Sequence, residues 1–147
     1  GHDWALIGAG VFEGEKIGRS KLEEQDWLTT VVEQDQGHMS ARVTGAMIDF
    51  LTPGDAAAII ERLADPAIKI VSLTIGKFNP AHPDIVADAQ PGARPKTVFG
   101  IILAGLLRRR ADGIVPFTVM SCDNIPHNGH VTSDGVIGLA RLIDEDL

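Results

Sequence analysis

The sequence has a single cysteine and no tyrosine among its 147 residues. One cysteine excludes an internal disulfide framework and is typical of a protein from a reducing, cytoplasmic compartment. The absence of tyrosine removes one common acid or base of enzyme chemistry. Basic residues are also few, since 13 Lys and Arg stand against 20 Asp and Glu, for a net charge of −7. This balance argues against a nucleic acid or an anionic membrane as partner.

Long apolar runs are missing as well. No stretch approaches the roughly 20 apolar residues that cross a bilayer, and the opening GHDWALIG has no basic region, so no signal peptide is visible. Hydrophobic residues make up 44% and charged residues 22% of the chain, which is ordinary for one globular domain. The only basic run, LLRRR at 106–110, ends a helical pattern. We expect it to complement the negative end of the helix dipole.

What the sequence does contain is an alternation of strand-like and helix-like segments. Short apolar or β-branched runs bounded by polar residues predict strands, and apolar residues at helical spacing predict helices. The uninterrupted strands favour a parallel sheet buried on both faces. The predicted fold class is therefore α/β, with an incomplete doubly wound, mainly parallel sheet and flanking helices. The expected strands are 4–10, 28–34, 40–51, 68–75 and 116–121, and the expected helices are 52–65, 95–112 and 130–144.

The segment LIGAGVFEGE invites comparison with a dinucleotide fingerprint, because Gly8 and Gly10 follow a strand. A strict fingerprint needs its third glycine where this chain has Glu13. A second interpretation fits better if residues 4–10 form the second strand of a doubly wound domain. Glu13 and Glu15 could then accept hydrogen bonds from the hydroxyls of an adenosine ribose. A plain acidic turn in solvent remains an alternative of equal weight.

The stretch VMSCDNIPHNGH at 119–130 carries the other reactive side chains. Cys122, His127 and His130 have a loosely metal-like spacing, but a structural zinc site needs four ligands and no second cluster lies nearby. A nucleophilic Cys122 would need a histidine beside it and an electropositive setting. The third interpretation is a loop at the carboxyl end of a strand, where open α/β sheets bind ligands. Asn124 would there offer its amide N–H to a developing oxyanion, with Asp123 orienting it.

A family resemblance favours the third interpretation. IKIVSLTI, HPDI and PKTVFGIILAGLLRRRADGIVPFTVMSCDNIPHNGH closely resemble the mannitol dehydrogenase and fructuronate reductase family of polyol-specific long-chain dehydrogenases. The earlier part of the chain is also similar, although residues 27–30 differ from the usual sequence of the family. The resemblance implies a Rossmann-like domain of an NAD-dependent oxidoreductase. Such an enzyme interconverts a secondary hydroxyl of a sugar alcohol or sugar acid with its ketone.

The resemblance also implies roles for particular residues. Asn124 matches the family asparagine that helps polarise the substrate oxygen. Glu13 and Glu15 fall where the family places acidic residues beside the adenosine ribose, which would favour NAD over NADP. Thr74, at the end of SLTI, is assigned to the cofactor site as well. We expect no metal ligands, because too few Cys and His residues are grouped in the sequence.

Departures from the family pattern limit the prediction. The family's first strand with its glycine turn for the pyrophosphate, and its helical domain with a lysine base, have no counterpart in this sequence. The segment after SLTI is also shorter, so we expect residues to be missing at the junction of Ile75 and Gly76. We therefore predict that residues 1–147 are part of an N-terminal dinucleotide-binding domain and are inactive alone. The alternatives are a non-catalytic nucleotide- or sugar-binding module and, more weakly, a metal-dependent lyase or hydrolase. The oligomeric state stays open.

Overall fold

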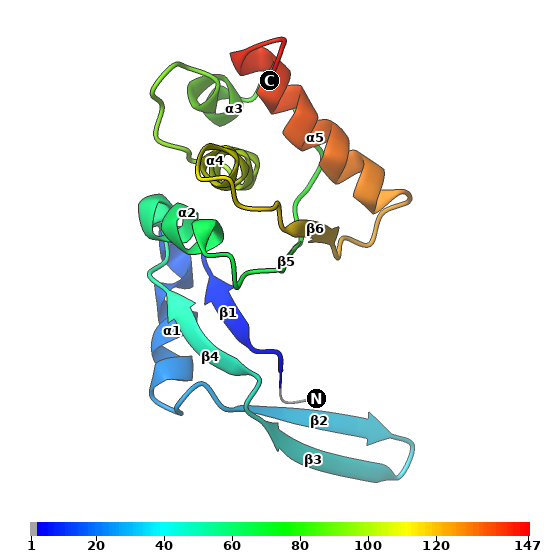
Figure 1. Cartoon of the computed structure of the whole chain (residues 1–147). Coiled ribbons are helices and arrows are strands. Elements are labelled where there is room, and N and C mark those ends of the chain that lie inside the picture. Colours follow the sequence, from blue (N-terminus) through cyan, green and yellow to red (C-terminus); the bar gives the residue numbers. More distant parts are fainter. Residues whose placement is uncertain (1–2) are drawn as a thin grey trace. The chain divides into compact units, whose positions relative to one another are not determined.

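The computed structural model describes residues 3–147, which divide into two compact units. The first unit ends at Asp55 and the second runs from Ala56 to Leu147. Each unit has its own parallel pair of strands with helices beside it (Figure 1). The α/β fold class predicted from the alternating pattern is confirmed.

The first unit is built around strands β1 (Leu6–Ala9) and β4 (Met47–Leu51), which pair in parallel. Between them along the chain come a short 3-10 turn, η1 (Glu13–Glu15), and helix α1 (Lys16–Glu23). Arg19 fixes α1 to the strands, because its Nε donates to the carbonyl oxygen of Phe50 at 2.9 Å. The sequence pattern did not predict α1, whose residues are mostly polar and exposed and therefore lack a clear apolar stripe.

Strands β2 (Thr29–Asp35) and β3 (His38–Thr44) form an antiparallel hairpin in the same unit. The prediction of one strand over 40–51 was wrong, because Gly45 and Ala46 separate β3 from β4. The turn of the hairpin contains Gly37 in the left-handed region, at φ 84°. Pairing Thr30 with Val43 and Val32 with Ala41 places uncharged side chains on one face. The charged side chains lie on the other, where Arg42 and Glu33 pair at 3.5 Å.

The second unit pairs strands β5 (Ile70–Leu73) and β6 (Thr118–Ser121) in parallel. One cluster of its apolar core consists of Ile85, Phe99, Leu103 and Leu139. Leu139 is completely buried, and the rings of Phe78 and Phe99 meet edge to face at 5.4 Å. The helices of this unit are α2 (Ala56–Ala64), α3 (Pro83–Asp88), α4 (Val98–Ala111) and α5 (Asn128–Ile143).

The strands are less buried than the sequence pattern suggested. Ile70 of β5 and Met120 of β6 are both 46% exposed. Among the residues that the structure describes, each sheet has two strands, so every strand has an edge without a hydrogen-bonded neighbour. The predicted sheet buried on both faces is therefore wrong for the described chain, whereas the parallel direction of β5 and β6 is confirmed.

The three arginines that end α4 have separate roles. Arg108 donates from Nε to Asp112 at 2.7 Å, and this hydrogen bond and the negative charge of Asp112 raise the pKa of Arg108. Arg109 is instead buried, at 1% exposed, and donates to the carbonyl oxygens of Leu63, Asp65, Ile68 and Val115. The expected basic end of α4 is confirmed, but the pattern did not predict that Arg109 is buried. Its guanidinium holds the end of α2 and the connections that lead into β5 and β6.

Candidate functional site

Glu13 and Glu15 lie in η1, immediately after the carboxyl end of β1. Glu15 Oε2 accepts a hydrogen bond from the backbone N–H of Phe12 at 3.2 Å. Glu13 is 82% exposed and its Oε1 lies 3.7 Å from Nζ of Lys16, which makes a weak surface ion pair. The two carboxylates therefore differ, because Glu15 supports the turn while Glu13 is directed into solvent.

The turn that carries these carboxylates is held against the loop after β4. The backbone N–H of Gly54 donates to the carbonyl oxygen of Gly10 at 3.1 Å. A Cβ atom on Gly10 would lie 3.1 Å from Cβ of Pro53 and 3.2 Å from Cβ of Glu15, so the main chain here is closely packed on both sides. The carboxyl ends of the parallel strands β1 and β4 thus share one edge, where open α/β sheets bind ligands.

Thr74 and Asn124 belong to the second unit and follow the carboxyl ends of β5 and β6. The last residues of these strands, Leu73 and Ser121, are direct partners in the parallel register. Both Thr74 and Asn124 are exposed. Within residues 3–147 neither side chain has a hydrogen-bond partner, so both are available to a ligand. The structure brings this predicted pair to the same edge of one sheet; Glu13 and Glu15 are in the other unit.

A network of hydrogen bonds holds the loop that carries Asn124. Oδ2 of Asp123 accepts from the backbone N–H of Ile75 at 2.8 Å and from Oγ of Ser121 at 3.2 Å. Nδ2 of Asn128 donates to the carbonyl oxygens of Asp123 at 2.9 Å and Ser121 at 3.3 Å. Asp123 is expected to orient Asn124, and within residues 3–147 no hydrogen bond joins the two side chains. The role of Asn128 could not be predicted from the sequence, because its partners lie five and seven residues earlier in the chain.

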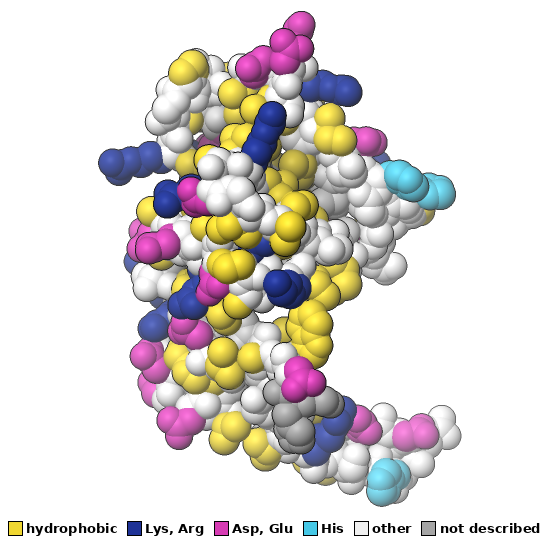
Figure 2. Space-filling view, in the orientation of Figure 1, with side chains coloured by type: hydrophobic (Ala, Val, Ile, Leu, Met, Phe, Trp, Pro, Cys, Tyr) yellow, Lys and Arg dark blue, Asp and Glu magenta, His cyan; other side chains and the backbone are white. Residues whose placement is uncertain are grey.

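The cysteine and histidines of this loop form no metal site that the structure shows. Cys122 is exposed, and its Sγ lies 3.9 Å from the carbonyl oxygen of Met120. The rings of His127 and His130 are 6.0 Å apart, and Figure 2 shows histidine side chains on the surface beside the start of α5. Over residues 3–147, no three side chains of His, Cys, Asp or Glu are grouped as metal ligands would be. No helix in this range is long and apolar enough to cross a membrane.

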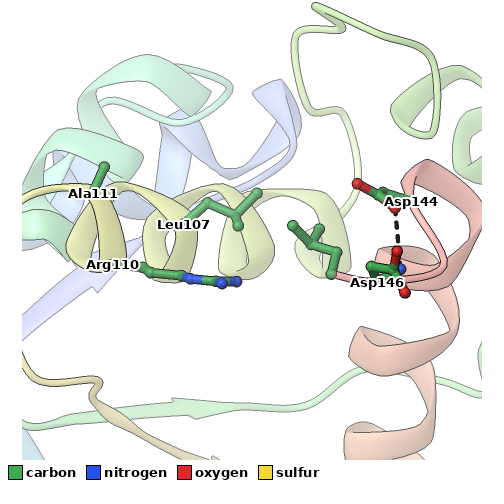
Figure 3. Close-up of a pocket in the computed structure, with 6 residues that line it drawn as sticks. Leu107, Arg110, Ala111, Asp144 and Asp146 are labelled. Carbon is green, nitrogen blue, oxygen red and sulfur yellow. Dashed lines mark hydrogen bonds between the residues drawn. The ribbon is translucent and has the colours of Figure 1, made fainter.

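A shallow, open depression lies elsewhere in the second unit, between the ends of α4 and α5. Its volume is about 480 Å³. Figure 3 shows Arg110 lying along α4 and Asp144 and Asp146 opposite it, where the backbone N–H of Asp146 donates to Asp144. None of the residues predicted for cofactor or substrate lines this depression. We assign no function to it.

Comparison with known proteins gives a consistent result over the whole chain. The family model described as "Mannitol dehydrogenase Rossmann domain" matches residues 1–147. Mannitol 2-dehydrogenase of Cereibacter sphaeroides is 53% identical over 158 aligned positions, which cover 100% of this chain and 33% of that protein. The polyol:NADP oxidoreductase of Gluconobacter oxydans is 40% identical over 161 positions, covering 99% of this chain and 33% of that protein.

Solved structures agree with the sequence comparison. The mannitol 2-dehydrogenase of Pseudomonas fluorescens, in a ternary complex with NAD and D-mannitol, has a TM-score of 0.89 and 41% identity. That match covers 98% of this chain and 32% of the other. A substrate-free D-sorbitol dehydrogenase has the same TM-score at 36% identity, covering 98% of this chain and 33% of the other. This chain therefore spans about a third of the length of these relatives.

Proposed function

The chain belongs to the mannitol dehydrogenase family, and on that premise we propose that it is part of the dinucleotide-binding domain of an NAD-dependent polyol dehydrogenase. The whole protein would interconvert a secondary hydroxyl of a sugar alcohol, or of a sugar acid as in fructuronate reductase, with the ketone. The observation that carries this proposal is the 41% identity and TM-score of 0.89 with a mannitol 2-dehydrogenase that holds NAD and D-mannitol. The single cysteine fits the cytoplasmic location that we propose with it.

The strand pairs support the assignment to a dinucleotide-binding domain. In the doubly wound order 3-2-1-4-5-6, the second and third strands pair on one side of the first strand, and the fourth and fifth pair on the other. The parallel pair of β1 and β4, and the parallel pair of β5 and β6, match those two pairs in chain order. We therefore propose that residues 1–147 are this domain without its first strand.

The carboxylates after β1 fit the adenosine end of NAD. A ribose presents two hydroxyl donors, and a carboxylate at the end of the second strand accepts them. We assign this role to Glu13, whose oxygens face solvent, and assign support of the turn to Glu15, which binds the N–H of Phe12. The negative charge of both residues would repel the 2′-phosphate of NADP. The proposed preference for NAD differs from the cofactor in the name of the polyol:NADP oxidoreductase relative.

Thr74 and Asn124 fit the nicotinamide end of NAD, where the hydride is transferred. NAD supplies the hydride acceptor when it is bound. The amide N–H of Asn124 would hold the substrate oxygen and stabilise the charge that develops on it, and the hydroxyl of Thr74 would bind the cofactor beside it. We propose that the proton of the substrate hydroxyl goes to a lysine on a helical domain outside residues 1–147. Lys69 does not fit this role, because its Nζ donates to the carbonyl oxygen of Pro66, before the start of β5.

The test uses the full-length protein and two neighbouring variants. Wild type should oxidise D-mannitol or reduce fructuronate with NAD or NADH, and Asn124→Ala should lower kcat by roughly 100- to 1,000-fold, as for loss of an oxyanion donor. Cys122→Ser, two residues away, should keep kcat. If Cys122→Ser is inactive and Asn124→Ala stays active, the result would support the alternative that Cys122 is a nucleophile. Binding of NAD without any turnover would support the non-catalytic module.

A further inference from the structure

The hydrogen bonding between β5 and β6 changes its acceptor at the end of the strands, while the donor stays the same. The backbone N–H of Cys122 donates to the carbonyl oxygen of Leu73 at 2.8 Å, which continues the parallel ladder. In a regular ladder the next bond would join the N–H of Ile75 to the carbonyl oxygen of Cys122. The N–H of Ile75 donates to Oδ2 of Asp123 instead, at 2.8 Å. A side-chain carboxylate thus takes the place of a main-chain acceptor.

This substitution of acceptor fixes the residues on either side of the bond. Thr74 lies between two anchored groups, the carbonyl oxygen of Leu73 and the N–H of Ile75. The side chain of Ile75 also packs against the apolar core of the unit. Asn124 directly follows Asp123 in the sequence. One carboxylate therefore sets the position of Thr74 relative to Asn124.

The surroundings of Asp123 hold its carboxylate in place. Oγ of Ser121 donates to the same Oδ2 at 3.2 Å. On the main-chain side, Nδ2 of Asn128, the first residue of α5, donates to the carbonyl oxygen of Asp123 at 2.9 Å. The loop is thus tied at one side to β5 and at the other to the start of α5. We expect the orientation of Asn124 to depend on both hydrogen bonds of Asp123, the one to Ile75 and the one to Asn128.

We propose that Asp123 is a positioning residue that holds the cofactor-binding segment at Thr74 and the substrate-binding Asn124 in their working geometry. The proposal rests on the proposed function, because it needs that reaction to be measured. Asp123 itself does not take part in proton transfer, so its charge is not required. What is required is an oxygen that accepts from the N–H of Ile75.

The decisive comparison is between Asp123→Ala and Asp123→Asn in the full-length protein. Alanine removes the acceptor, whereas the amide oxygen of asparagine can accept from Ile75 and from Ser121 in the same place. Asp123→Ala should lower kcat for D-mannitol oxidation by roughly 10- to 100-fold, the effect of misplacing reacting groups by about 1 Å. KM for NAD should change less than kcat. Asp123→Asn should be close to wild type in kcat, with an unchanged pH profile.

Asp88 provides a matched control. Its buried carboxylate also accepts backbone N–H groups, from Lys96 at 2.7 Å and Thr97 at 2.9 Å, but it joins α3 to the start of α4. Asp88→Ala should lower the melting temperature without changing kcat per folded molecule. If Asp88→Ala or Asp123→Ala does not fold, the kcat and pH profile of Asp123→Asn decide. Amide hydrogen exchange of residues 74–76 reports directly on the hydrogen bond from the N–H of Ile75 to Asp123. The exchange should be faster in Asp123→Ala than in Asp123→Asn.

Three results would overturn the proposal. The first is an Asp123→Ala variant with normal kcat, and the second is an Asp123→Asn variant as impaired as Asp123→Ala. The third is exchange at Ile75 that no substitution changes. Failure of the proposed function looks different, because wild type would then turn over no polyol with NAD. The exchange measurement would still show whether Asp123 holds the N–H of Ile75.

Discussion

Glu13 and Glu15 are two residues apart, yet their carboxylates have different partners. We predict that Glu13→Gln weakens NAD binding by roughly tenfold, because a neutral amide oxygen accepts a hydrogen bond from a ribose hydroxyl more weakly than a charged carboxylate does. Glu15→Gln should have a smaller effect, since its amide oxygen can still accept from the N–H of Phe12. Kd values for NAD and NADP, measured on both variants, check the assignment. If Glu13→Gln binds NAD as wild type does, Glu13 belongs to a plain acidic turn.

Arg109 connects several segments of the second unit. Its guanidinium donates to four carbonyl oxygens and lies 5.0 Å from the ring centre of Phe117. A lysine has one ammonium group and cannot reach all four oxygens, so some would be buried without a donor. We predict that Arg109→Lys lowers the free energy of unfolding by about 2–4 kcal/mol.

The neighbouring residue supplies the control for Arg109. Arg110→Lys should leave the urea midpoint unchanged, because Arg110 is exposed and its side chain has no hydrogen bond to residues 3–147. Urea unfolding followed by circular dichroism measures both variants. If Arg109→Lys and Arg110→Lys lower the free energy of unfolding equally, the role that we give to the buried guanidinium is wrong.

Single residues were predicted from the sequence only where type and position carried the signal. Asn124 follows the predicted strand 116–121, so its place at the carboxyl edge of a sheet could be predicted without coordinates. Thr74 lay inside the predicted strand 68–75, and only the family resemblance assigned it to the cofactor site. Arg109 could not be distinguished from Arg108 and Arg110, because its partners are carbonyl oxygens at least six residues away. The acceptor role of Asp123 toward Ile75 was hidden for the same reason, across 48 residues.

At the scale of elements, the close contact of α2 with α4 depends on Gly105. A Cβ atom there would lie 2.9 Å from the side chain of Leu63, which is buried. We predict that Gly105→Ala lowers the free energy of unfolding by about 1–2 kcal/mol, because overpacking exceeds the gain in helix propensity. Gly18 of α1 has nothing within 4 Å of its Cβ position. Gly18→Ala should therefore stabilise by about 0.5–1 kcal/mol.

Thermal and urea unfolding of the two glycine variants measure whether Gly105→Ala lowers the free energy of unfolding while Gly18→Ala raises it. A stabilised Gly105→Ala variant would mean that α2 moves away from α4 without cost, against the packing described here. A destabilised Gly18→Ala variant would mean that the exposed face of α1 is covered by another part of the protein. The two substitutions are the same chemical change, so propensity alone predicts the same sign for both.

Elements were predicted well where one pattern held over a long run. The apolar pattern over 95–112 contains α4, and the pattern over 130–144 overlaps α5 apart from its first turn. The prediction over 40–51 was wrong because its two halves belong to different sheets, and alternation along a chain does not report a change of partner. The short helix α3 was missed, although Pro83 at its start and the cap from His82 are typical of a helix N-terminus.

At the scale of the whole molecule, the comparisons bear on a length difference seen in the sequence. The aligned region of the Cereibacter sphaeroides relative has 158 positions against 147 residues here, so at least 11 positions have no residue of this chain. We expect from the sequence that residues are missing at the junction of Ile75 and Gly76, within residues 74–79, which run without helix or strand. Such a difference could be suspected only from the family resemblance, because nothing in composition or periodicity marks it.

The last prediction concerns residues 1–147 expressed alone. We predict no measurable NAD-linked oxidation of D-mannitol, because the proposed lysine base lies outside this chain and the described strands form separate pairs. NAD should bind weakly, since the proposed first strand and its pyrophosphate turn are also outside. Steady-state assays and calorimetry on the isolated chain, with the full-length protein as reference, measure both. Turnover by the isolated chain would mean that its own side chains supply the base, and the proposal of a lysine from another domain would then be wrong.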